Sequence, residues 1–71
     1  MSAFNFKSWL SSIDLELDDK IILSEWLETN HIRTKVSLMG LNEVDINALD
    51  IGIRSDLRVA INWLKGKKYH T

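Results

Sequence analysis

The sequence predicts an all-α domain, a compact bundle of five helices that ends in a long C-terminal helix. Apolar residues recur at helical spacing along nearly the whole chain, and no segment alternates strictly as a half-buried strand would. The 71 residues, 45% of them hydrophobic and with a net charge of −1, have a globular composition and the length of one domain. We therefore expect one helical domain over residues 5–66, with flexible termini at residues 1–4 and 67–71.

The first helix is expected from Asn5 to about Ser12. Four apolar residues in and just after this segment fall on one helical face: Phe6, Trp9, Leu10 and Ile13. The second helix is expected to begin near Asp18 and Asp19, because either side chain can cap the free amides of a first turn.

The second helix is expected to end at about Thr29. Its core face is formed by four residues that share one arc: Ile22, Leu23, Trp26 and Leu27. Ile21 points away from that arc, beside Glu25 and Glu28, so we expect its side chain to be exposed.

The middle of the chain predicts two short helices. Residues 30–34 are expected to form a connector, after which three apolar residues support a short helix or turn before Gly40: Val36, Leu38 and Met39. Asn42 and Asp45 form a variant of the capping box, which indicates the start of a short fourth helix. Its apolar contacts are expected from Val44, Ile46 and Leu49.

A glycine turn is expected before the last helix. Gly52 would break the fourth helix with an unusual backbone angle, and Ile51 and Ile53 would anchor the turn in the core. Ser55 would then cap the last helix, with Asp56 at its positive end. Three lysines would crowd its negative end around Gly66: Lys65, Lys67 and Lys68.

The last helix carries a core stripe and two other large apolar residues. The stripe consists of Leu57, Ala60, Ile61 and Leu64. Val59 lies off it and is expected to be an exposed apolar contact, whereas Trp63 is expected to pack on Phe4 and Phe6 near the chain ends. The centre of the core is expected to contain Trp9, Trp26, Ile53 and Ile61.

Several functional classes are excluded by what the sequence lacks. No apolar run exceeds three residues, so neither a membrane span nor a secretory signal is expected. The chain has no cysteine, which rules out disulfides and thiolate zinc sites and fits a reducing, cytoplasmic location. His31 and His70 have no second ligand at metal-binding spacing, and the glycines form no phosphate-binding loop. We expect no cofactor, no metal, no small-molecule substrate and no catalytic residues.

Charge is distributed unevenly along the chain. The first thirty residues carry a net charge of −4, and the remainder carries +3. Such a domain can present opposite signs on two surfaces, which favours self-complementary association. The alternative is a set of scattered charges that water solvates.

The order of residues resembles that of the sterile alpha motif (SAM) domain over roughly residues 6–65. The resemblance rests on Trp9-Leu10, Asn30-His31-Ile32, Leu41 to Ile46 and above all Leu49-Asp50-Ile51-Gly52-Ile53 ahead of a long helix. Two features depart from the family pattern: Arg54 to Leu57 follow Ile53 at once, and the segment between Ile13 and Leu23 is longer. These departures affect the expected interaction surface more than the fold.

The resemblance implies a protein-interaction module of a larger signalling or scaffold protein, which binds itself or another SAM-like domain head to tail. The basic surface that it implies at the start of the last helix consists of Arg54 and Arg58, with Val59 as an apolar neighbour. The acidic surface that it implies on the middle helices consists of Glu43, Asp45, Asp50, Glu28 and Ile21. A contact between two different surfaces closes into a ring or continues as an open polymer.

Two alternatives remain open. Some members of the family bind RNA hairpins, a role for which the candidates are Arg33, Lys35, Lys65, Lys67 and Lys68, with Tyr69 available for base stacking. The second half of the chain is also similar to the ubiquitin-associated domain, through Met39-Gly40-Leu41, Ala48-Leu49 and Asp56 to Leu64. That similarity leaves Trp9 and Trp26 unexplained, so it ranks second for the fold.

Overall fold

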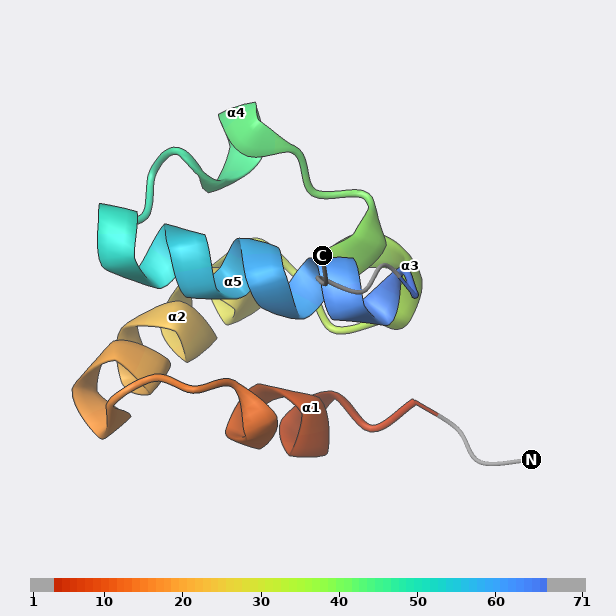
Figure 1. Cartoon of the computed structure of the whole chain (residues 1–71), viewed down its shortest axis with the longest axis horizontal. Coiled ribbons are helices and arrows are strands. Elements are labelled where there is room, and N and C mark those ends of the chain that lie inside the picture. Colours follow the sequence, from red (N-terminus) through yellow and green to blue (C-terminus); the bar gives the residue numbers. More distant parts are fainter. Residues whose placement is uncertain (1–3, 67–71) are drawn as a thin grey trace, which may run out of the picture.

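Helix α5 (Ile51–Leu64) lies at the centre of the fold, between α1 on one side and α4 on the other (Figure 1). The computed structural model describes residues 4–66 of the chain. Within that range the order is α1 (Phe6–Ser12), α2 (Leu17–Thr29), α3 (Lys35–Met39), α4 (Glu43–Ile46) and α5, with no strand. The predicted all-α class, the five helices and the long final helix are confirmed. Residues 1–3 and 67–71, which include Lys67, Lys68, Tyr69 and His70, lie outside the described residues.

The first two helices begin in different ways. Asn5 caps α1, and its Oδ1 accepts a hydrogen bond from the Ser8 amide at 2.9 Å. Helix α2 begins at Leu17, where no side chain caps it, so the prediction that Asp18 or Asp19 provides the cap was wrong. Both aspartates lie in the first turn instead, where their charge still favours the positive end of the helix dipole.

The two short helices are each held by reciprocal capping. The Asp45 amide donates to Asn42 Oδ1 at 3.0 Å, and the Asn42 amide donates to Asp45 Oδ2 at 3.1 Å, which confirms the predicted capping box of α4. Thr34 and Ser37 form the same arrangement at the start of α3. A single turn needs such caps because it has few internal backbone hydrogen bonds of its own.

Helix α5 begins five residues earlier than the sequence indicated, with its N-cap at Asp50 instead of Ser55. Its first turn is closed by a 2.8 Å hydrogen bond from the Arg54 amide to the Asp50 carbonyl, so Ser55 lies inside the helix rather than at its cap. Gly52 lies in that first turn, and the only described glycine with a positive φ is Gly66, at 80°. The predictions of a glycine break at Gly52 and of a cap at Ser55 were therefore wrong.

Helix α5 begins before Gly52 because of the position of its apolar stripe. Ile53, Leu57 and Ile61 are buried at successive i, i+4 positions, so the helix has to include Ile53 to place that side chain in the core. Ile51 is two residues away from Ile53, so the same phase turns it outward and leaves it 71% exposed instead of anchored. One glycine costs a helix only about 0.5–1 kcal/mol, less than the burial of one isoleucine contributes.

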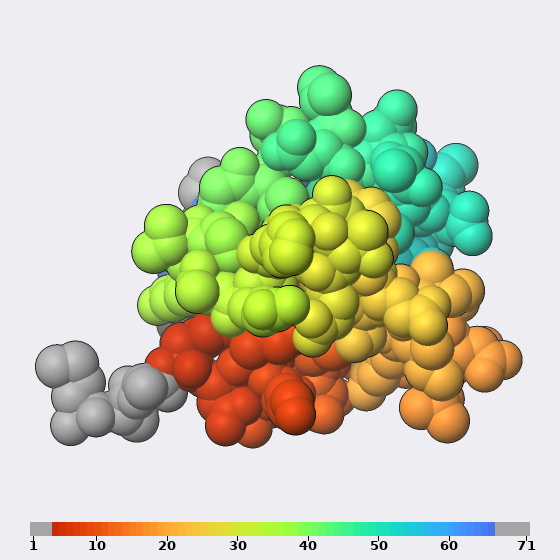
Figure 2. Space-filling view, turned by 180° about the vertical axis from the view of Figure 1, so that it is seen from behind, coloured from red at the N-terminus to blue at the C-terminus, as the bar shows by residue number. Residues whose placement is uncertain are grey.

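The core draws on every segment except α1, which contributes partly buried side chains. Its fully enclosed members are Leu23, Leu27, Leu38 and Leu57, and the remaining buried residues are Ile13, Ile32, Ile46, Leu49, Ile53 and Ile61. Trp9 and Trp26 are only partly buried, so they lie at the edge of the core rather than at its centre. Seen from behind, the later turns of α5 are almost hidden under the preceding segments (Figure 2).

Besides Ile51, three other large side chains expected in the interior lie at the surface. Ile22 is 47% exposed, because the contact arc of α2 is centred on Leu23 and Leu27. Val44 is 84% exposed, since the single turn of α4 buries only Ile46. Trp63 is 54% exposed.

Trp63 does not hold the N-terminal aromatic residues as predicted. The rings of Phe4 and Phe6 pack on Trp9 instead, with ring centroids 6.4 and 6.1 Å from that of Trp9. The expected exposure of Ile21 and Val59 is confirmed.

Replacement of Leu57 by Ala should remove most of the stability of the domain. The side chain is fully buried, and such a truncation costs about 2–5 kcal/mol, comparable to the roughly 3–5 kcal/mol that a core of this size supplies. The same truncation at Leu17, which is 73% exposed, should change the free energy of unfolding by less than about 0.5 kcal/mol. Urea unfolding followed by circular dichroism compares the two variants, and equal losses would contradict the packing described above.

Two glycine substitutions should change stability in opposite directions. A Cβ at position 52 meets no atom within 4 Å, so Gly52→Ala should stabilise the domain by about 0.5–1 kcal/mol. Gly66 has a φ of 80°, so Gly66→Ala should destabilise it by roughly 1 kcal/mol. Thermal unfolding distinguishes them, and a lower melting temperature for Gly52→Ala would restore the predicted glycine turn.

Candidate interaction surfaces

One residue expected on the basic surface and one expected on the acidic surface are paired with each other. Arg58 on α5 donates from Nε to Glu43 Oε2 at 2.7 Å and from Nη2 to Glu43 Oε1 at 2.8 Å. This two-point ion pair joins α5 to the start of α4. Opposite charges that the sequence assigned to separate surfaces therefore meet within one molecule.

Arg54 lies on the same side of α5, one turn earlier. Its Nη1 donates to Asn47 Oδ1 at 2.5 Å, which ties it to the segment after α4. These two arginines, Glu43, Asn47 and the exposed Val44 line one shallow hollow, which we call the α4–α5 surface. It is a mixed-charge surface around an apolar residue.

The other members of the predicted acidic set are distributed over several elements. Asp45 is engaged in the capping box of α4, and Asp50 is the exposed residue at the start of α5, with no side-chain capping bond. Glu28 on α2 accepts from Arg33 Nη2 at 2.8 Å. Ile21, also on α2, lines a small hollow against α1 with Leu10.

The residues proposed for RNA and for ubiquitin are also spread over several elements. Arg33 is paired with Glu28, Lys35 is the first residue of α3, and Lys65 follows the last turn of α5. For the ubiquitin alternative, Met39 and Leu41 are half-buried, and Leu41 packs against the core.

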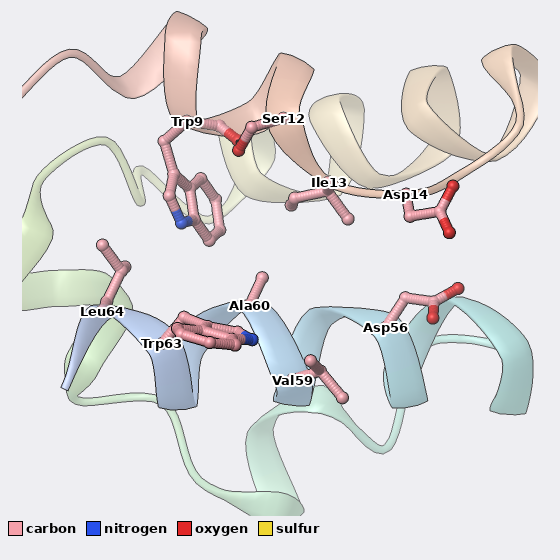
Figure 3. Close-up of a pocket in the computed structure, with 9 residues that line it drawn as sticks. All are labelled: Trp9, Ser12, Ile13, Asp14, Asp56, Val59, Ala60, Trp63 and Leu64. Atoms are coloured by element: carbon pink, nitrogen blue, oxygen red, sulfur yellow. The ribbon is translucent and has the colours of Figure 1, made fainter. Parts of the chain in front are cut away.

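A groove between α1 and α5, which the sequence did not predict, has a mostly apolar lining. It encloses about 400 Å³. Trp9 and Ser12 form the wall on α1, and Val59 and Trp63 contribute to the wall on α5, as Figure 3 shows. The buried Ile13 also borders it. We call this feature the Trp groove.

The two ends of the Trp groove differ in polarity. Asp14, which follows α1, and Asp56 on α5 lie at one end, whereas Trp9, Trp63 and Leu64 lie toward the other (Figure 3). Among residues 4–66, neither aspartate has a hydrogen bond or an ion pair through its side chain. The groove is therefore apolar along most of its length and negative at one end.

The sequence contained a partial signal for this groove. Val59 and Trp63 lie four residues apart and off the core stripe, so they share one outward face of α5. Their partner wall is formed by residues some fifty positions earlier, and no local pattern indicates that α1 lies beside α5.

Neither a cluster of metal ligands nor a membrane-spanning helix is found among residues 4–66. Residues 4–66 contain no group of three histidine, cysteine or carboxylate side chains placed to hold a metal ion. In the same range, no helix is both long and apolar enough to cross a bilayer.

No protein-family model, curated protein or solved structure was found to match this chain.

The ion pair on the α4–α5 surface should be visible in the titration of Glu43. The hydrogen bonds from Arg58 and, to a smaller extent, the charges of Arg58 and Arg54 hold the pKa of the Glu43 carboxyl below its ordinary value of 4.5. A carboxyl with a lowered pKa in the folded state stabilises the fold above pH 4.5, and that stabilisation is lost as the pH falls through the lowered pKa.

Arg58→Gln should raise the Glu43 midpoint toward 4.5, measured by NMR of the side-chain carboxyl carbon. Arg33→Gln, which removes the guanidinium from the other ion pair, is the matched control and should leave the Glu43 midpoint unchanged. A midpoint that does not move in Arg58→Gln would show that the pair is not formed in solution.

Proposed function

We propose that this chain is a non-catalytic protein-interaction module of a larger signalling or scaffold protein, acting in the cytoplasm. The observation that carries the proposal is the number of large apolar side chains left outside an already complete core. In residues 4–66 these are Leu17, Ile21, Ile22, Val36, Val44, Ile51, Val59 and Trp63. Three of them are grouped with charged residues, Val44 on the α4–α5 surface and Val59 and Trp63 in the Trp groove. Apolar side chains grouped with charges in this way are typical of surfaces that bind other proteins.

The α4–α5 surface supports association with a second copy or with another SAM-like domain. Val44 is surrounded there by Glu43, Arg54 and Arg58, so an apolar contact is bordered by both signs of charge. A partner that offers a carboxylate to Arg58 would compete with Glu43 for the guanidinium. Because exposed ion pairs exchange at little cost, an intermolecular pair can replace the internal one once the apolar contact is buried.

Sedimentation of the wild type and of Arg58→Glu at low and moderate salt tests this proposal. The average molar mass of the wild type should rise with protein concentration. It should fall as salt is added, because salt screens the exposed charges. Arg58→Glu places a second carboxylate beside Glu43 and should stay monomeric. Arg33→Glu likewise reverses the charge of the cation in an exposed ion pair. That pair lies between α2 and the loop that follows it, so this variant should behave like the wild type. A wild type whose mass changes with neither concentration nor salt would exclude self-association.

A further inference from the structure

The Trp groove has features that the association through the α4–α5 surface does not use. Its lining residues do not include Arg54, Arg58 or Glu43. Arg54 and Val59 lie on different flanks of α5, because the helix turns by ~100° per residue. A partner in the groove therefore leaves the α4–α5 surface open.

The shape of the groove suits a helix better than a compact ligand. Its α5 wall extends from Asp56 through Val59 and Ala60 to Trp63 and Leu64, which is two helical turns and about 12 Å at ~1.5 Å per residue. A helix laid along such a wall contacts it with side chains at i, i+4 and i+7. The apolar section of the wall would accept the first two of these, and the section beside Asp56 would receive the third.

The charge of the groove determines which helix fits. Asp14 and Asp56 come from different elements and lie at the same end of the groove, and within residues 4–66 no cation neutralises them. An apolar partner with a neutral or acidic end would leave both carboxylates desolvated without compensation, which costs binding energy. Lysine or arginine at that end would supply the missing charge.

We infer that the Trp groove binds an amphipathic basic helix of a partner protein, with two apolar side chains one turn apart against Trp63 and Val59, and with basic side chains one turn further on against Asp56 and Asp14. This inference rests on the proposed role as an interaction module and assigns a second binding surface to it. The partner is recognised by its chemistry, an apolar pair followed by cations on one helical face.

The three tryptophans provide a site-resolved test. Trp9 and Trp63 line the groove, whereas Trp26 lies on α2 outside it and is an internal control. The probe is a synthetic alanine- and glutamine-based helix with two leucines one turn apart and two lysines on the next turn of the same face. Its control carries glutamates in place of the two lysines.

Titration with the lysine peptide should shift the indole N–H resonances of Trp9 and Trp63 and leave that of Trp26 in place. The shifts should saturate and weaken with salt, and the glutamate peptide should bind at least about fivefold more weakly. In the double variant Asp14→Asn, Asp56→Asn, the ratio of the affinity for the lysine peptide to that for the glutamate peptide should fall by about five- to tenfold. A Trp26 resonance at its wild-type position verifies that the double variant is folded.

Three outcomes would overturn the inference: no shift of Trp9 or Trp63 at millimolar lysine peptide, equal binding of both peptides, or a larger shift at Trp26 than in the groove. Arg58→Glu separates this inference from the proposed function, because it should abolish self-association and bind the lysine peptide like the wild type. If the wild type is monomeric but binds this peptide, the self-association fails and the groove assignment stands.

Discussion

Burial of one face of α5 is the constraint on which the rest of this structure depends. Ile53, Leu57 and Ile61 occupy successive turns of that face, and each is almost fully enclosed. The other segments supply the side chains that cover them, with α3 packed against α5 and α2 packed against α1. A chain this short has only one core, so no second cluster can compensate for a loss at this face.

The same helical phase decides where the two candidate surfaces lie. Once Ile53, Leu57 and Ile61 point inward, Arg54 and Arg58 have to project on one flank of α5. Val59 and Trp63 project on the other flank for the same reason. A charged surface shared with α4 and an apolar groove shared with α1 are thus two consequences of a single buried stripe. They differ in composition, since one contains the Arg58–Glu43 ion pair and the other is lined by tryptophan, so they suit partners of different chemistry.

The intramolecular pairing of charge changes how the sequence should be interpreted. Net charges of −4 and +3 in the two parts of the chain suggested two opposed surfaces. In the folded domain, Arg33 of the second part pairs with Glu28 of the first, whereas Arg58 and Glu43 pair with each other within the second part. Asp14 and Asp56 were assigned no part in binding on sequence grounds, yet they are charges that residues 4–66 leave without a partner.

The sequence by itself determined the fold class, the number of helices, the long final helix and the capping box of the fourth helix. These features depend on contacts within about four residues, as between Asn42 and Asp45, so a local pattern is sufficient to predict them. Only the tertiary structure decided that α5 begins ahead of Gly52 and that Arg58 pairs with Glu43. Each of these depends on which segments lie side by side. The apolar faces of all segments compete for one core, and the outcome of that competition sets the arrangement. A single stretch of sequence contains only one of the competing faces.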